Sequence, residues 1–336
     1  MATQTSAHEP NPLLLFDAMN AYQRSAALKA AVELDLFTHI AAGATATAEI
    51  ARRCQASEKG TRILCDFLAI DGFLTKENGA YGLTPDTAFF LDKKSPGYMG
   101  SIALFLVHPH HFANYMDLAD VVRKGGTVRG EGNMDAENPI WVDFAKWMAP
   151  MSAHSAAAMA QILNMPGKAV KVLDIASGPG AYGIEIAKLN PLAEIHGLDW
   201  KNVVQLSLEH ARLAGVGDRY HTIAGSAFDV DLGSGYDLVL LPNFLHHFNH
   251  ATNVKLLKRV RAALRPGGRV ATVEFVPNPD RITPPQAASF SMMMLGSTAD
   301  GDAYTFAELE AMFHNAGFAN SKAQPLGPQT LIVTEY

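Results

Sequence analysis

The sequence VKVLDIASGPGAYG, residues 170–183, decides the fold of this 336-residue chain. Its first residues alternate apolar side chains in the manner of a buried parallel strand. Gly178-Pro179-Gly180 cannot continue that strand, and residues 184–189 then follow helical spacing. A second apolar stretch, residues 194–198, ends at Asp199. This order of a strand, a glycine turn, a helix and a second strand that ends in an acid predicts an adenosine site. In such a site the glycines let the ligand approach the backbone closely, and Asp199 accepts hydrogen bonds from both ribose hydroxyls.

Two cofactor classes fit this pattern. Gly178-x-Gly180-x-x-Gly183 matches the dinucleotide fingerprint, which is a weak signal by itself. In that fingerprint the helix N-terminus faces a pyrophosphate, which a nearby carboxylate would repel. Asp174 stands four residues before the first glycine, and a carboxylate there suits a ligand that bears an ammonium and a sulfonium. LDIASGPG with a later LDW therefore resembles the S-adenosylmethionine (SAM) site of class I methyltransferases, with a nicotinamide-dependent oxidoreductase as the main alternative.

Composition excludes several classes of protein. Apolar residues make up 48% of the chain and the net charge is −6, which argues against disorder and against a nucleic-acid footprint. Cys54 and Cys65 are too few for a disulfide framework and lack zinc-site spacing. The N-terminus has no signal pattern, and no apolar run is long enough to cross a bilayer. We expect a soluble, cytoplasmic protein that binds neither nucleic acid nor a membrane.

The two halves of the chain have different periodicities. Residues 12–165 are mainly helical in pattern, whereas residues 170–336 alternate strands with helices. The expected strands are 170–176, 194–199, 219–224, 236–241 and 269–276, followed by a pair at 321–326 and 329–335. The expected helices between them are 183–190, 201–214, 251–264 and 305–316. This α/β alternation predicts a doubly wound, mostly parallel sheet with ligands outside the carboxyl ends of its strands.

The N-terminal part has the outline of a winged helix. Helical segments at residues 47–56 and 57–72 precede a short hairpin whose turn is Glu77-Asn78-Gly79. Residues 45–94 contain seven Lys or Arg and seven Asp or Glu, so the electrostatic attraction that drives DNA binding is lacking. We therefore expect an interaction or dimerisation module. A winged-helix ligand sensor, the alternative, would need a basic recognition helix.

A histidine and a carboxylate are placed to meet at the cofactor side of the sheet. His246 follows the strand at 236–241, in PNFLHHF, and Glu274 ends the next one, in VATVEF. Methyl transfer to a phenol requires an aligned oxygen and removal of its proton, for which a histidine base is apt. A carboxylate behind the histidine fixes its tautomer. The alternative is that His246 only caps a loop. The other histidines lack carboxylate or thiolate partners at metal-ligand spacing, so no metal is expected.

Taken together, these residues resemble the SAM-dependent O-methyltransferases of the caffeic acid and hydroxyindole type, including bacterial enzymes that act on aromatic polyketides. The resemblance covers nearly the whole chain. It implies a Rossmann-like class I methyltransferase domain with a seven-stranded sheet and an N-terminal winged-helix dimerisation domain, hence a homodimer. The implied boundaries are 1–100 for dimerisation, 101–165 for a helical connector that lines the substrate pocket, and 166–336 for SAM binding and catalysis.

The resemblance also assigns site residues. It makes His246 the general base and Glu274 the acid that orients it. The implied SAM contacts, with S-adenosyl-L-homocysteine (SAH) as product, are Asp174, Gly178, Gly180, Asp199, Trp200, Ser226, Ala227, Phe228 and Asn243. The implied contacts of a small, aromatic hydroxyl substrate are Trp147, Met151, His154, His247 and Met294.

The chain departs from the family pattern at four positions. Ser226 replaces an aspartate at the adenine, His247 an acid, and Phe248 a tryptophan. Ala303 stands where the family has a second glutamate that orients the base. Because of Ala303, two alternatives stay open: an acceptor that is a thiol or an amine, or a member of the family that uses SAM without methylating.

Overall fold

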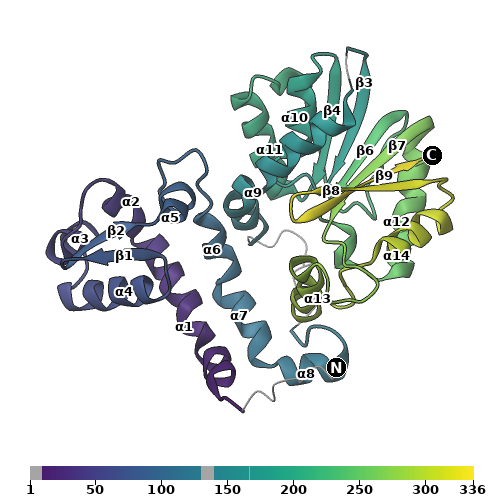
Figure 1. Cartoon of the computed structure of the whole chain (residues 1–336). Helices are drawn as coiled ribbons and strands as arrows, with labels where there is room; N and C mark the ends of the chain where they lie inside the picture. The colour runs from purple at the N-terminus through teal and green to yellow at the C-terminus, as the bar shows by residue number, and fades with distance from the viewer. Residues whose placement is uncertain (1–9, 130–139, 166) are drawn as a thin grey trace, which may run out of the picture. The chain divides into compact units, whose positions relative to one another are not determined.

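A computed structural model describes residues 10–129, 140–165 and 167–336 of the chain. The chain divides into two compact units, residues 1–108 and 109–336 (Figure 1).

The N-terminal unit is a helical domain with one hairpin. Its elements are α1 (Leu13–Glu33), α2 (Leu36–Ala41), α3 (Thr47–Arg53), α4 (Glu58–Ile70), β1 (Leu74–Glu77), β2 (Ala80–Leu83), α5 (Pro85–Phe90) and α6 (Ser101–Leu106). The strands pair antiparallel, with Leu74 opposite Leu83. Phe37, Ile50, Leu68 and Tyr81 are buried in its core. The predicted order of helices and hairpin is confirmed.

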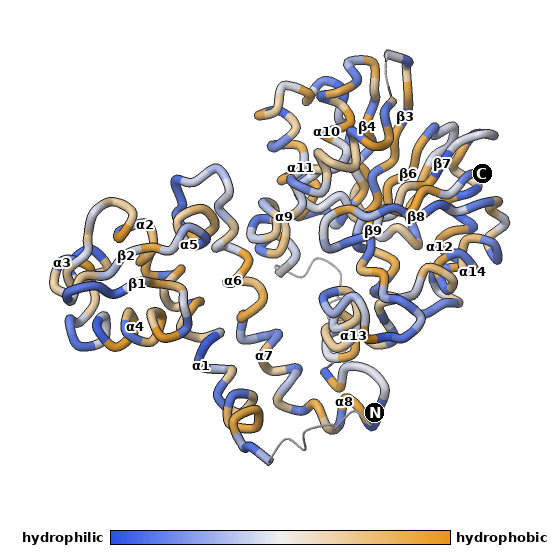
Figure 2. The backbone as a smooth tube through the Cα atoms, in the orientation of Figure 1, coloured by the Kyte–Doolittle hydropathy of each residue, from blue (hydrophilic) through white to orange (hydrophobic). Residues whose placement is uncertain are grey.

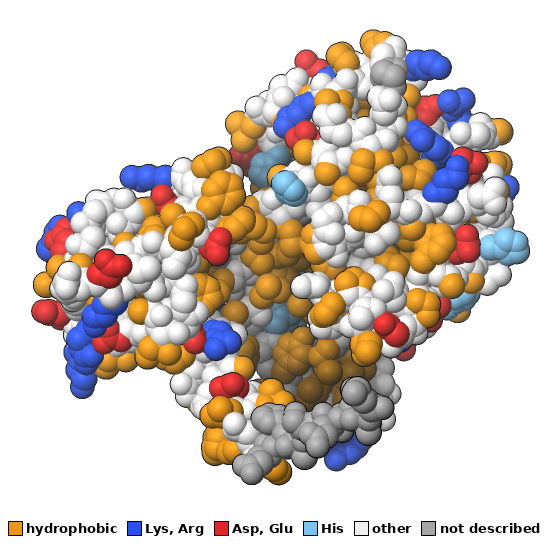
Figure 3. All heavy atoms as spheres, viewed as in Figure 1, with side chains coloured by type: hydrophobic (Ala, Val, Ile, Leu, Met, Phe, Trp, Pro, Cys, Tyr) orange, Lys and Arg blue, Asp and Glu red, His pale blue; other side chains and the backbone are white. Residues whose placement is uncertain are grey.

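The first turns of α1 expose a continuous apolar surface. Leu13, Leu14, Leu15 and Phe16 are 52–81% exposed, and Figure 2 shows this stretch as strongly hydrophobic. Acidic and basic side chains are mixed over the visible face of the unit (Figure 3), as their equal numbers predicted. The surface of this unit therefore favours contact with another apolar surface over contact with a phosphate backbone.

The second unit begins with helices and continues into the sheet. Its first helices are α7 (Pro109–Met116), α8 (Leu118–Lys124) and α9 (Ile140–Leu163). The strands are β3 (Val170–Ile175), β4 (Ala193–Asp199), β5 (Tyr220–Ala224), β6 (Tyr236–Pro242), β7 (Leu264–Glu274), β8 (Ser321–Leu326) and β9 (Gln329–Glu335). Their order is β5-β4-β3-β6-β7-β9-β8. Among these strands only β9 runs antiparallel to the others, so the predicted mostly parallel, seven-stranded sheet is confirmed.

Helices cover both faces of the sheet (Figure 1). They include α10 (Ala181–Leu189), α11 (Lys201–Leu213), α12 (His250–Ala263) and α14 (Phe306–Asn315), whereas α13 (Pro285–Ser297) packs against α7 and α8. One apolar core includes residues of α9, α10 and α11, and the other includes residues of α12 and α14. The chain leaves β3 toward β4 on one side, while β6 and β7 lie on the other side. The carboxyl ends of β3 and β6 therefore flank the crevice where doubly wound sheets bind ligands.

Two elements differ from the sequence-based expectation. β7 begins at Leu264, not at residue 269, and its pairing with β6 shifts register near Tyr236. Helix α13 was not predicted, because FSMMMLGS places apolar residues consecutively and so gives no helical period.

Candidate active site

The glycine turn after β3 is built from residues in unusual backbone conformations. Ala176, Gly178 and Gly180 all have positive φ, between +52° and +80°. A Cβ on Gly180 would also lie 2.9 Å from the hydroxyl of Tyr220. A side chain is therefore excluded at Gly180 by both backbone strain and space.

Asp199 joins this turn to the end of β4. Its Oδ2 accepts a hydrogen bond from the Gly178 amide at 2.8 Å, and its Oδ1 accepts one from the Trp200 amide at 2.7 Å. Burial raises the pKa of Asp199 to about 6, against the lowering effect of these two amides. The structure thus brings Asp199 and Gly178 together, where the adenosine of a cofactor is expected.

Asp174 is fully buried beneath the same turn. Its Oδ2 accepts from the Gly183 amide at 3.1 Å, whereas its Oδ1 has no hydrogen-bond partner among the described residues. Burial raises the pKa of Asp174 to about 8; Gly183 lowers it, and Asp199 raises it further. A buried acid with an unpaired oxygen fits a cationic group, since an opposite charge would stabilise the carboxylate. The site therefore suits the charges of SAM.

The segment expected at the adenine is held to β4. The Gly225 amide donates to the Asp199 carbonyl at 2.9 Å, and Ser226 Oγ accepts from the Phe228 amide at 3.1 Å. Ala227 is buried. Ser226 therefore caps its own turn.

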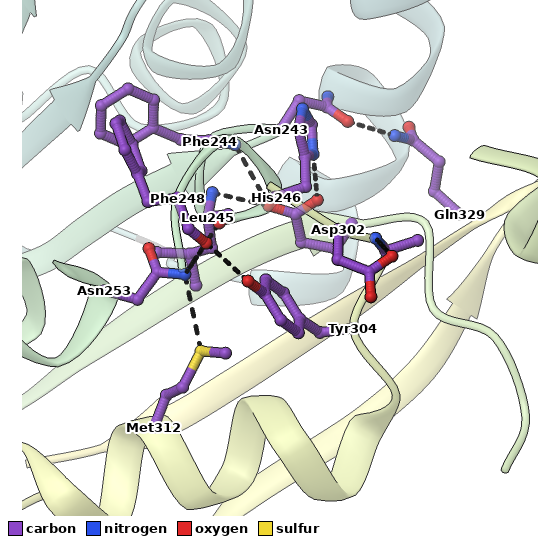
Figure 4. Close-up of polar contacts among 12 residues, drawn as sticks. Asn243, Phe244, Leu245, His246, Phe248, Asn253, Asp302, Tyr304, Met312 and Gln329 are labelled. Atoms are coloured by element: carbon purple, nitrogen blue, oxygen red, sulfur yellow. Dashed lines mark hydrogen bonds and ion pairs between the residues drawn. The ribbon is translucent and has the colours of Figure 1, made fainter. Parts of the chain in front are cut away.

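His246 and Glu274 meet at the carboxyl ends of β6 and β7 (Figure 4). His246 Nδ1 and Glu274 Oε2 are 2.6 Å apart. Glu274 Oε1 accepts hydrogen bonds from the amides of Phe244, at 3.1 Å, and Leu245, at 2.9 Å. His246 is 5% exposed and Glu274 is 2% exposed. Glu274 therefore fixes both the histidine ring and the turn that carries it.

Among the described residues, the region around Ala303 supplies no second acid to His246. Ala303 is fully buried, and its carbonyl accepts from Arg281. The carboxylate of Asp302 lies 3.4 Å from Arg281 Nη1, while its amide donates to the His246 carbonyl at 3.0 Å. In the described part of the chain, Glu274 is the acid paired with His246.

His247 lies directly beside His246. Its ring centroid lies 4.4 Å from that of His246. Burial, and then the His246 charge, lower the pKa of His247 well below its usual range. Its Nδ1 atom is buried and has no partner among the described residues. Trp141 approaches the His247 ring edge-on at 6.2 Å.

Two aromatic residues that were not predicted from the sequence pack beside His246, one against the other. The Phe290 ring on α13 meets His246 edge-on at 4.8 Å and stacks on Phe275 at 4.3 Å. Met294, one turn further along α13 and predicted as a substrate contact, is buried. The available sequence signal was the position of Phe275 directly after Glu274.

The predicted substrate residues on α9 differ in exposure. Trp147 and Met151 are half-buried, whereas His154 is exposed. Ser155, which follows it, is buried and donates to Gln329 at 3.4 Å. The contacts around His246 described above do not include these three predicted residues.

The fold, the acids around the glycine turn, and the His246–Glu274 pair together define a class I methyltransferase. The profile of the O-methyltransferase domain matches residues 115–319, and that of the O-methyltransferase dimerisation domain matches residues 16–93. The chain therefore belongs to the O-methyltransferase family, as predicted.

Individual relatives support this assignment. The 3-hydroxy-5-methyl-1-naphthoate 3-O-methyltransferase of Streptomyces sahachiroi is 29% identical over 91% of this chain and 89% of its own. A candidate O-methyltransferase from Nostoc punctiforme, solved by crystallography, is 50% identical with a TM-score of 0.94, over 98% of this chain and 100% of its own.

A third relative bears on the cofactor. PigF of Serratia is named as an S-adenosyl-L-methionine-dependent methyl transferase. Its structure with SAH is 26% identical with a TM-score of 0.85, over 97% of this chain and 100% of its own. With the charges of the site, these findings confirm SAM as the cofactor. No helix in the described ranges is long and apolar enough to span a membrane.

Proposed function

We propose that the protein transfers the methyl group of SAM to a hydroxyl of a small aromatic molecule, with His246 as the general base. The observation that carries this proposal is the His246–Glu274 pair at the ends of β6 and β7, in the sheet whose neighbouring strand β3 leads into the glycine turn. The cofactor-binding part is proposed to include Gly180, Trp200, Ala227, Phe228 and Asn243, with the residues already described around Asp174 and Asp199.

The protein supplies proton transfer and alignment. SAM, when bound, supplies a methyl group already activated by its sulfonium. The Glu274 carboxylate accepts the Nδ1 proton of His246, which leaves the Nε2 lone pair free to take the proton of the acceptor hydroxyl. When His246 takes that proton, the adjacent negative charge stabilises the imidazolium. A phenol with a pKa near 10 is mostly un-ionised at neutral pH, so this step raises the reactivity of its oxygen.

An aromatic acceptor is supported by what surrounds the base. Phe290 and Phe275 offer ring surfaces, and Met294 adds a polarisable side chain. The naphthoate named for the Streptomyces relative is an aromatic hydroxyl compound. We further propose Trp147, Met151, His154 and His247 as acceptor contacts.

The test is a rate comparison on purified protein with labelled SAM and phenolic, thiol and amine acceptors. His246→Ala should lower the rate on a weakly acidic phenol about 10²- to 10⁴-fold and leave SAM affinity nearly unchanged. A small loss on that phenol would show that alignment alone, without a base, drives the reaction.

Ala303 favours one second candidate, a thiol acceptor. A thiol ionises at lower pH than a phenol, so it needs less help from a base that one carboxylate supports. Faster turnover of thiols than of phenols in the same panel would support this candidate.

We also propose a homodimer formed through residues 1–100, with residues 101–165 lining the substrate pocket and 166–336 binding SAM. The exposed apolar start of α1 and the match to the dimerisation domain support this. The two cysteines are free and buried, which supports the proposed cytoplasmic location, where thiols stay reduced.

A further inference from the structure

A cluster of buried neutral polar side chains lies between the glycine turn and the base. Tyr182, in the first turn of α10, is 4% exposed, and so is Gln329 at the start of β9. Ser155 of α9 is 8% exposed. Asn243 directly follows β6 and is half-buried. Four separate elements thus bring neutral hydrogen-bonding groups to the crevice end of the sheet.

Gln329 holds the amide of Asn243 in one orientation. Gln329 Nε2 donates to Asn243 Oδ1 at 2.5 Å (Figure 4). Gln329 Oε1 accepts from Ser155 Oγ at 3.4 Å. The Asn243 backbone has φ +53° and donates to the Val273 carbonyl at 2.8 Å. Because the oxygen of the Asn243 amide faces Gln329, its Nδ2 hydrogens are turned toward the remaining side of the cluster.

Tyr182 adds a second unused donor. Its hydroxyl is buried and makes no hydrogen bond of good geometry with the described residues. Ser155 and Asn243 nevertheless lie close enough to lower its pKa, although burial raises that pKa more strongly. A buried hydroxyl without a partner costs stability, so its presence calls for a ligand.

The chemistry of the cofactor indicates which group these donors receive. The ammonium and the carboxylate of an amino acid share one carbon, so a donor for the carboxylate must lie near the acid that binds the ammonium. Asp174 has the unpaired oxygen that suits an ammonium, and its charge acts on the Tyr182 hydroxyl. The charge of Glu274 also raises the pKa of this hydroxyl.

We infer that the Tyr182 hydroxyl and Asn243 Nδ2 form a donor pair for the carboxylate of the methionyl group of SAM, and that Gln329 is the positioning residue for Asn243. The inference depends on the cofactor and not on the base. It assigns recognition of a carboxylate to neutral donors.

The test compares SAM with decarboxylated SAM, which keeps the sulfonium and the ammonium. In calorimetry, Tyr182→Phe should weaken SAM roughly 10- to 100-fold, the range for a lost hydrogen bond to a charged group, and should not change decarboxylated SAM. The melting temperature of the unliganded protein should stay the same or rise, because an unpaired hydroxyl is removed. Tyr236→Phe is the matched control, since this buried tyrosine lies at the opposite end of β6.

Gln329→Leu should reproduce the selective loss through Asn243, and its effect should not add to that of Asn243→Ala. Gln324→Leu, on the neighbouring strand, should leave both affinities unchanged. Equal weakening of SAM and decarboxylated SAM by Tyr182→Phe would overturn the inference in favour of a packing role. Unchanged SAM affinity with a raised acceptor KM would overturn it too, because the donors would then face the acceptor. No acceptor is present in the binding test, so failure of the His246 proposal would not change the result expected for SAM binding.

Discussion

Replacing Glu274 by glutamine tests the base assignment most directly, because Glu274→Gln keeps the shape of the side chain and removes its charge. Glu274 Oε1 accepts from two backbone amides, so the carbonyl oxygen of the glutamine should stay on that side. The NH₂ group must then face His246 Nδ1, which is 2.6 Å from the other oxygen. Nδ1 becomes an acceptor, and the ring proton moves to Nε2, where it blocks uptake of the acceptor proton.

The expected loss follows from this change of tautomer. The rate on a phenol with a pKa near 10 should fall about 10²- to 10⁴-fold, close to the effect of His246→Ala, because the ring remains but can no longer act as a base. The hydrogen bonds to Phe244 and Leu245 become neutral, which should lower the free energy of unfolding by about 1–3 kcal/mol in total. The turn should therefore stay folded.

The assay measures single-turnover rates at saturating SAM on two phenols, one with a pKa near 10 and one acidic enough to be ionised at the assay pH. The loss should be large on the first and small on the second, and SAM affinity should match that of the unmodified protein. A loss of less than tenfold on the weakly acidic phenol, with the variant folded, would refute the tautomer argument. Equal losses on both phenols would point to misalignment instead.

Three further outcomes are expected. Since the pKa of Asp174 is raised to about 8, SAM binding at pH 7 should release a proton, and SAM affinity should rise by up to about tenfold per pH unit before levelling off above pH 8. Calorimetry in buffers of different ionisation enthalpy measures this proton release, and a pH-independent affinity would contradict the expectation. From about pH 4 to 8 the folded chain holds an Asp174 proton that the unfolded chain has lost, so the free energy of unfolding should fall as pH rises. Asp174→Asn should remove this pH dependence. Thermal unfolding that shows the same pH dependence in the variant would exclude Asp174 as its source. Leu14→Glu with Leu15→Glu should reduce the light-scattering mass from twice the chain mass to 36.2 kDa, whereas Leu213→Glu, equally exposed but in the second unit, should not; a dimer that survives the double change would place the interface elsewhere.

The sequence by itself determined the fold class and the cofactor. The deciding features are local: apolar alternation in residues 170–175, a turn that requires glycine at residue 180, and acids at residues 174 and 199. Short-range sterics and charge are enough to interpret them as a strand, a glycine turn and a cofactor site. The mostly parallel sheet followed from the alternation of strands and helices, because such alternation requires crossover connections between parallel strands. The equal numbers of acidic and basic residues in the winged-helix segment likewise argued correctly for the dimerisation domain family.

Only the tertiary structure decided how the site is held together. Glu274 was expected behind His246, but its second oxygen also binds the Phe244 and Leu245 amides, and no periodicity reports such a contact between two strands. Helix α13 brings Phe290 to His246 from a segment without a helical period in its sequence. Gln329 and Asn243 are 86 residues apart in the chain and meet only because β9 returns antiparallel along β7. Contacts of this kind depend on the packing of distant elements, and packing is not encoded in any single stretch of sequence.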